Sequence, residues 1–256
     1  MRLTVRMPGW LEAGGWGLLA GSALLLGAAV GFLVHLPQRV VASVMAFGAG
    51  VLLSAVSFEL ITEAHDQGGL PPTVLGAVAG ALLYTGCNVL LARQGARHRK
   101  RSRAPEPAGP DNDAGGAIAL GALLDGIPES VVIGASLLGG GSISTVTIAA
   151  VFISNVPEGL SSATGMRRSG RSAWYIFGLW TGIAVISAVA AVAGHTLLGG
   201  ASPALLAAIT ALAAGAILAM IADTMIPEAF DNAHLATGLI TVAGFLTAFA
   251  LSQLGS

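Results

Sequence analysis

Residues 40–58 read VVASVMAFGAGVLLSAVSF, a run of nineteen residues without one charged side chain. A helix needs about 20 mainly apolar residues to cross the hydrocarbon core of a membrane. Two carboxylates, Glu59 and Glu63, follow this run directly and are four residues apart. The stretch therefore predicts a membrane-spanning helix over about residues 40–63, with acidic groups in its second half.

The rest of the chain has the same apolar character. Of its 256 residues, 54% are hydrophobic and only 10% are charged, and the mean hydropathy is +0.80. A water-soluble domain carries about 25% charged residues. The sequence therefore predicts one all-α domain over residues 1–256, a polytopic transmembrane helical bundle surrounded by the lipid bilayer of the cell membrane. Eight spans are expected, at about 14–36, 40–63, 71–93, 115–138, 143–166, 172–198, 203–228 and 235–254.

One long connection, residues 94–114, differs from the rest of the chain. It is basic in its first part and rich in Pro, Gly and acidic residues in its second, which predicts a disordered loop. Basic residues beside a span are better explained by a cytoplasmic loop near anionic lipid than by nucleic-acid binding, so no nucleic-acid partner is expected. With eight spans, ten of the twelve Lys and Arg residues lie on the side of this loop. This bias predicts that both termini lie outside.

Two expected spans carry acidic residues far from their ends, where a charge costs about 2.5–3.5 kcal/mol on insertion scales. Residues 124–130 read LDGIPES, and residues 154–159 read SNVPEG. Asp125 and Glu129 share one helical face, and so do Asn155 and Glu158. Each proline frees the backbone carbonyl four residues earlier, so carboxylates and free carbonyl oxygens come together. Such oxygen donors predict a cation site at membrane depth.

Four further acidic residues lie closer to the ends of their spans. Glu63 and Glu228 are near enough to an end to lie at the membrane interface, where a charge costs little. Glu59 and Asp223 lie about one turn deeper. We interpret all four as candidate entrance or exit relays for the cation.

A short internal repeat is visible in the sequence. Residues 46–64 align without gaps on residues 211–229, an offset of 165. The two spans that contain these segments would start on opposite sides of the membrane. The alignment therefore predicts inverted-repeat character, which is common among secondary transporters.

Enzymatic chemistry has little support in this sequence, and the protein is not expected to be an enzyme. The single cysteine, Cys87, excludes a disulfide framework. No phosphate-binding loop or Ser-His-Asp arrangement is present, and an intramembrane protease would have to use Asp125 and Asp223, which lie in no protease motif that we identify. The five histidines fall in loops or near span ends and are not assigned as ligands: His35, His65, His98, His195 and His234.

The pattern as a whole resembles the ZIP family of zinc and iron permeases. The likeness covers nearly the whole chain, including eight spans and a variable loop after the third, and is most specific in the two Pro-Glu segments. In the family, His-Asn-x-Pro-Glu-Gly and a related Pro-Glu motif form a two-metal centre. Here Asp125 stands in the position of the first histidine, Ser154 in the first ligand position of the second motif, and Asn155 in its acidic position. Val185 stands where the family has a further carboxylate, in the sixth span.

The resemblance implies a carrier that moves a divalent metal cation of the zinc, manganese or iron class into the cytoplasm. The metal would be the transported substrate and not a resident cofactor. Without the family's histidines, oxygen donors alone remain, and these favour harder ions such as Mn²⁺, Mg²⁺ or Ca²⁺. Two alternatives stay open: a non-transporting membrane scaffold or interaction protein with a degenerate metal centre, and an enzyme that uses the intramembrane carboxylates. A homodimer is the candidate assembly. The implied ligand set is Asp125, Glu129, Ser154, Asn155 and Glu158.

Overall fold

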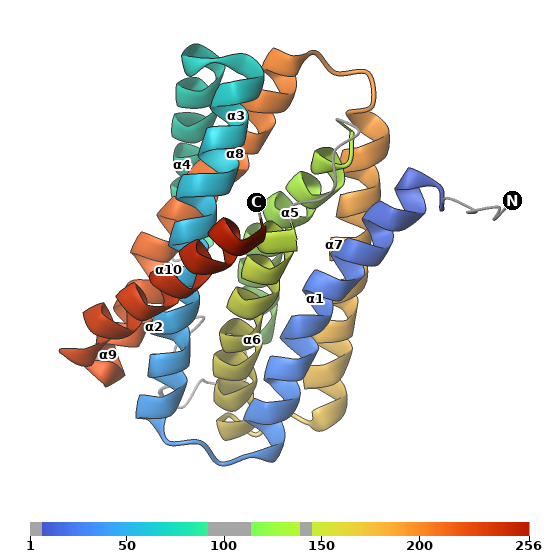
Figure 1. The fold of residues 1–256 in the computed structure, drawn as a ribbon. Helices are drawn as coiled ribbons and strands as arrows, with labels where there is room; N and C mark the ends of the chain where they lie inside the picture. The colour runs from blue at the N-terminus through green and yellow to red at the C-terminus, as the bar shows by residue number, and fades with distance from the viewer. Residues whose placement is uncertain (1–6, 92–113, 139–144, 256) are drawn as a thin grey trace, which may run out of the picture.

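The computed structural model describes residues 7–91, 114–138 and 145–255. The expected loop at 94–114 lies outside these ranges, apart from the backbone of its last residue. Side chains are likewise not described at Leu91, 114–119, Asp125, 145–146 and Gly255. Every regular element among the described residues is helical (Figure 1), and together they make eight helical rods, the number that the sequence predicts.

Six of the eight rods are uninterrupted α-helices. The second and seventh rods each contain a short π-helix in their middle, and each continues five residues past its expected end. The uninterrupted rods are α1 (Gly9–Leu33), α4 (Leu70–Leu91), α5 (Ala114–Ser136), α6 (Thr145–Arg168), α7 (Ala173–Leu197) and α10 (Ala236–Gly255). The second rod is α2 (Gln38–Ala55), η1 (Val56–Leu60) and α3 (Ile61–Gly68), and the seventh is α8 (Pro203–Met220), η3 (Ile221–Met225) and α9 (Ile226–Ala233).

Counting described residues alone, six rods are both long and apolar enough to cross a membrane: α1, α2 to α3, α4, α7, α8 to α9, and α10. The other two, α5 and α6, contain 23 and 24 residues. At 1.5 Å per residue they are about 35 Å long, which exceeds the roughly 30 Å of a hydrocarbon core. These two rods carry the buried polar residues described below.

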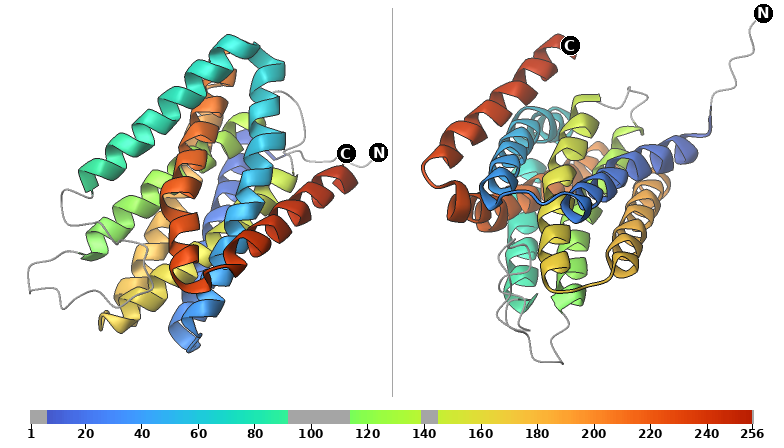
Figure 2. Two further views of the ribbon diagram at one scale, coloured as in Figure 1. Left: turned by 90° about the vertical axis from the view of Figure 1, so that its left-hand side faces the viewer. Right: turned by 90° about the horizontal axis from the view of Figure 1, so that it is seen from below.

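The rods form two groups that lie side by side (Figures 1 and 2). In the first group, α1 packs against α6 and α7, and α5 packs against α7. In the second group, α4 packs along α8, and α10 packs along α2. Contacts of α2 with α6, and of α8 with α5, join the groups. The candidate metal residues all belong to α5 and α6 and therefore to the first group.

Glycines set the close approach between neighbouring rods. A methyl group at Gly50 in α2 would lie 1.9 Å from the carbonyl oxygen of Thr241 in α10. A methyl group at Gly215 in α8 would lie 1.9 Å from the carbonyl oxygen of Ala77 in α4. No side chain fits at such distances, so these backbones pack directly against each other, as small residues allow in membrane bundles.

The second and seventh rods correspond closely to each other. Each has 31 residues, Gln38–Gly68 and Pro203–Ala233. Their π-helices begin 165 residues apart, at Val56 and Ile221, which is also the offset of the sequence alignment. The residue that follows each rod has a positive φ, 76° at Gly69 and 50° at His234. Their packing corresponds as well, because α3 packs against α8 while α9 packs against α2.

Candidate metal centre

The described candidate residues are buried inside the bundle. Glu129 of α5 is 4% exposed, and Ser154, Asn155 and Glu158 of α6 are 3%, 6% and 7% exposed. Acidic residues are almost never buried to this degree unless they are paired or bind a metal. Asp125 lies on α5 one turn before Glu129, and its side chain lies outside the described part of the chain.

Both helices continue through a proline next to these residues, Pro128 in α5 and Pro157 in α6. Proline has no N–H group, so the carbonyls of Leu124 and Ile153 lose the donor that a regular helix supplies. Each helix therefore offers one main-chain oxygen five residues before its buried carboxylate. Those oxygens and carboxylates are the donor types that hard cations prefer.

A hydrogen bond fixes the orientation of Asn155. Its Nδ2 donates to the main-chain carbonyl oxygen of Ala20 in α1, at 3.0 Å. A carbonyl can only accept, so the amide nitrogen must face α1. The amide oxygen, Oδ1, is then the end of this side chain that is left to bind a cation.

The other two helices of the first group also reach this region. A methyl group at Gly21, next to Ala20 in α1, would lie 3.3 Å from Cβ of Ser187 in α7. A methyl group at Gly126 in α5 would lie 3.6 Å from Oγ of the same serine. Asn155 thus contacts α1 at Ala20, the adjacent Gly21 packs against Ser187 of α7, and Ser187 packs against Gly126 of α5. The candidate centre lies where α1, α5, α6 and α7 converge.

Ser187 is a polar group that the sequence prediction missed. It is 5% exposed and lies on the buried face of α7. Val185, which stands in the position of the family's carboxylate, is 51% exposed and lies on the outer face of the helix. In the structure, Ile183, Ser187 and Ala191 are buried together on one helical face at a spacing of four residues, but no signal in the sequence selected that face.

On one side of the candidate centre lies an apolar cluster of Ala20, Ile133 and Val151, with Trp16 packed against it. Val151 is one turn before Asn155 on α6, and Ile133 is one turn after Glu129 on α5. The cluster therefore fills the space between α1, α5 and α6 directly next to the polar residues.

On the other side, polar contacts continue along α6. Ser161, one turn after Glu158, is fully buried and donates a hydrogen bond to Oε1 of Glu228 in α9. Glu228 is only 7% exposed, so it is buried inside the protein although it lies near the end of its expected span. The reason is that α9 continues five residues beyond it, to Ala233, and packs against the rest of the bundle.

The structure does not gather the four candidate relays at one place. Glu59 accepts a hydrogen bond from Ser252 of α10, at 2.5 Å. Glu63 accepts one from Gln67 of its own helix, at 2.9 Å. Asp223 is exposed on η3. Glu228 contacts a helix of the candidate centre, because it accepts a hydrogen bond from Ser161 of α6.

Within the described part of the chain, no three His, Cys, Asp or Glu side chains lie close enough together to hold a metal ion. The described donors are therefore the carboxylates of Glu129 and Glu158, the amide of Asn155 and the hydroxyl of Ser154. Asp125 would be the third acidic group on the same pair of helices.

The assignment of the chain to a protein family rests on two curated relatives. No protein-family model matches the sequence. The zinc transporters ZupT of Salmonella heidelberg and Salmonella newport are each 31% identical to it over 224 residues, which is 83% of this chain and 84% of the relative. The chain belongs to the ZIP family of metal transporters. As a ZIP protein with six apolar rods among its described residues, it is a multi-pass membrane protein.

Proposed function

We propose that this ZIP protein carries a divalent cation of the zinc class through the first group of helices and into the cytoplasm. The observation that carries the proposal is the burial of Glu129 and Glu158, which are 4% and 7% exposed. Ionisable residues inside a membrane bundle are costly and mark ion pathways. A divalent cation between α5 and α6 would neutralise both carboxylates. The names of the Salmonella relatives, which are zinc transporters, support zinc as one cargo.

Each proposed ligand has its own role in binding the cation. Asp125, Glu129 and Glu158 neutralise the ion, and Asn155 supplies Oδ1 while its Nδ2 holds Ala20. The Ser154 hydroxyl donates to the carbonyl oxygen of Val151 at 2.9 Å, which leaves its lone pairs for the cation. Zinc accepts carboxylate oxygen but is bound most often through histidine and cysteine. An all-oxygen set therefore favours weaker discrimination between Zn²⁺ and Mn²⁺ than an imidazole site would give.

The inward direction of transport follows from the family resemblance, and the two sides of the candidate centre suggest where the cation would enter and leave. The last turn of α6 carries Arg167 and Arg168. The positive-inside rule places this end in the cytoplasm, and both chain termini outside. The buried pair of Ser161 and Glu228 lies towards this end, while the apolar cluster around Val151 lies towards the other. A cation would therefore leave past Glu228, which acts as the exit relay, and Glu59 and Glu63 are the entrance relays.

Alternating access requires the apolar cluster to open. The matching second and seventh rods, with their exchanged partners α10 and α4, support an inverted repeat of the two halves of the chain. In transporters built this way, one bundle moves largely as a rigid body against the other. We propose that the first group moves against the second, which opens the centre to each side in turn.

Zinc uptake into proteoliposomes tests the proposed function. Glu129→Gln and Glu158→Gln keep the size of each side chain but remove its charge, and each is expected to lower uptake at least tenfold. Glu12→Gln, in the first turn of α1, is the matched control and should leave uptake unchanged. Unchanged uptake in both centre variants would refute the carrier proposal. A wild-type protein that neither binds nor transports Zn²⁺, Mn²⁺, Fe²⁺ or Mg²⁺ would favour the scaffold alternative.

A further inference from the structure

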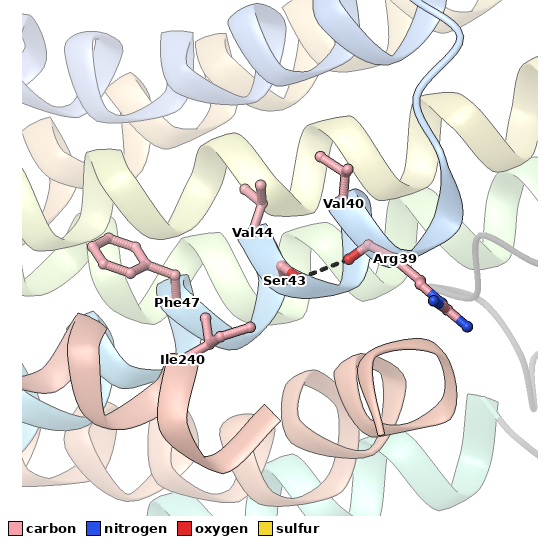
Figure 3. A pocket seen from close by; sticks show the side chains of 6 residues that line it. All are labelled: Arg39, Val40, Ser43, Val44, Phe47 and Ile240. Atoms are coloured by element: carbon pink, nitrogen blue, oxygen red, sulfur yellow. Dashed lines mark hydrogen bonds between the residues drawn. The ribbon is translucent and has the colours of Figure 1, made fainter. Parts of the chain in front are cut away.

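A groove on the surface of the second group lies between α2 and α10, on helices other than those of the candidate metal centre (Figure 3). Its volume is about 440 Å³, and it is shallow and largely open to the surroundings. Pockets for small molecules have volumes of about 300–1,000 Å³. The groove is lined by Arg39, Val40, Ser43, Val44, Phe47 and Ile240.

The lining is apolar except at one end. The hydroxyl group of Ser43 donates to the main-chain carbonyl oxygen of Arg39 at 2.8 Å, so this polar group is satisfied within α2. Val44, Phe47 and Ile240 supply the apolar wall. Figure 3 shows the side chain of Arg39 at the far end of the row from Phe47, extending away from the helix. The groove thus has an apolar body and a single cationic end.

The surroundings of the groove are those of a lipid-facing surface. Val40, Leu239 and Val242 are 42%, 78% and 54% exposed on two rods that can cross a membrane. Arg39 is the second residue of α2 and is itself exposed, so it lies where a span meets the head-group region. The first turn of a helix also carries a partial positive charge, which adds to that of the guanidinium.

We propose that this groove binds one anionic phospholipid, with an acyl chain along Val44, Phe47 and Ile240 and the phosphate group against Arg39. Arginine binds phosphate through paired, charge-assisted hydrogen bonds, and a basic residue at the membrane surface attracts anionic lipid. The basic run at 93–103 carries the same sign of charge as Arg39, so charge complementarity does not favour that segment as the occupant.

Native mass spectrometry of the full chain, released from nanodiscs of mixed phosphatidylglycerol and phosphatidylcholine, tests the proposal. The wild-type protein should retain one phosphatidylglycerol in preference to phosphatidylcholine. Arg39→Gln should lower that retention about fivefold, the amount expected for one basic residue at a membrane surface. Arg168→Gln removes an exposed charge at the end of α6 and should leave retention unchanged.

A second pair of variants tests the apolar part of the groove without changing any charge. Val44→Trp fills the groove and should lower retention of phosphatidylglycerol, whereas Val74→Trp, at a 49% exposed position of α4, should not. Equal losses in Arg39→Gln and Arg168→Gln would overturn the proposal, as would full retention in Val44→Trp. Displacement of the lipid by inorganic phosphate alone, or a dimer that Val44→Trp dissociates, would also overturn it, because the occupant would then be free phosphate or a second copy of the chain.

Discussion

The hydroxyl group of Ser161 in α6 donates a hydrogen bond to Oε1 of Glu228 in α9, across 67 residues of sequence. The serine is fully buried and the glutamate is 7% exposed. This contact joins the group of helices that holds the candidate metal centre to the group beside it. It also lies one helical turn from Glu158, so an ion leaving the centre along α6 would meet Glu228 next.

Ser161→Ala should destabilise the protein and slow zinc release together. The substitution removes a buried donor from a carboxylate, which costs about 1–3 kcal/mol. The thermal midpoint in detergent and the rate of zinc uptake measure the two effects. Ser169→Ala, at an exposed position at the end of α6, is the control and should change neither. A Ser161→Ala protein with wild-type stability and wild-type uptake would show that the contact has no role in either.

Asn155→Asp is expected to lower the stability of the metal-free protein and to strengthen its binding of zinc. The carboxylate would place an oxygen against the carbonyl oxygen of Ala20, which now accepts from Nδ2, so the metal-free protein should melt at a lower temperature. The added charge should strengthen zinc binding, and zinc should raise the melting temperature more than in the wild type. Thermal unfolding with and without zinc measures both the melting temperature of the metal-free protein and the increase that zinc produces. A smaller zinc-induced increase than in the wild type would argue against Asn155 as a ligand.

Ser187→Asp is predicted to raise zinc affinity, and Val185→Asp is not. Ser187 is buried beside Gly126 of α5, so a carboxylate there would point into the candidate centre. Val185 is 51% exposed on the outer face of α7, so a carboxylate there would point away. Calorimetric titration with zinc should give at least a tenfold tighter dissociation constant for Ser187→Asp. The opposite order of affinities would place the centre on the other face of α7.

Gly50→Ala and Gly215→Ala should each destabilise the bundle by about 2 kcal/mol or more, because the added methyl group would overlap a carbonyl oxygen of the facing helix. Gly86→Ala is the control, since nothing lies within 4 Å of its Cβ position. That variant should be stabilised by about 0.5–1 kcal/mol through helix propensity. Chemical denaturation in detergent measures all three. Equal stabilities of Gly50→Ala and Gly86→Ala would contradict the close packing of α2 on α10.

Much of the fold could be predicted because each rod is specified by its own apolar residues. The run at 40–58 and its seven counterparts are long enough to define eight rods without tertiary information. The two π-helices could not be predicted. A π-helix has about one more residue per turn than an α-helix, but it needs no different amino-acid composition. Nothing in residues 56–60, for example, distinguishes them from the α-helix around them.

The sequence could predict those parts of the candidate site that depend only on the spacing of residues along one helix. Asn155 and Glu158 share a face by their spacing alone, and both are buried. Contacts between helices were not predictable in this way. The bond from Asn155 to Ala20 and the burial of Glu228 against Ser161 depend on how α1, α6 and α9 pack. Residue types alone gave no reason to choose Ser187 over Val185.

Anomalous diffraction from crystals grown with zinc tests the central claim most directly, that the carboxylates of α5 and α6 bind the same cation. The account predicts one strong peak inside the first group of helices, about 2.0–2.2 Å from carboxylate oxygens of both Glu129 and Glu158. It also predicts that the peak is lost in the variant that carries Glu129→Gln and Glu158→Gln together. A zinc peak that contacts neither carboxylate, or one that persists in the double variant, would contradict it.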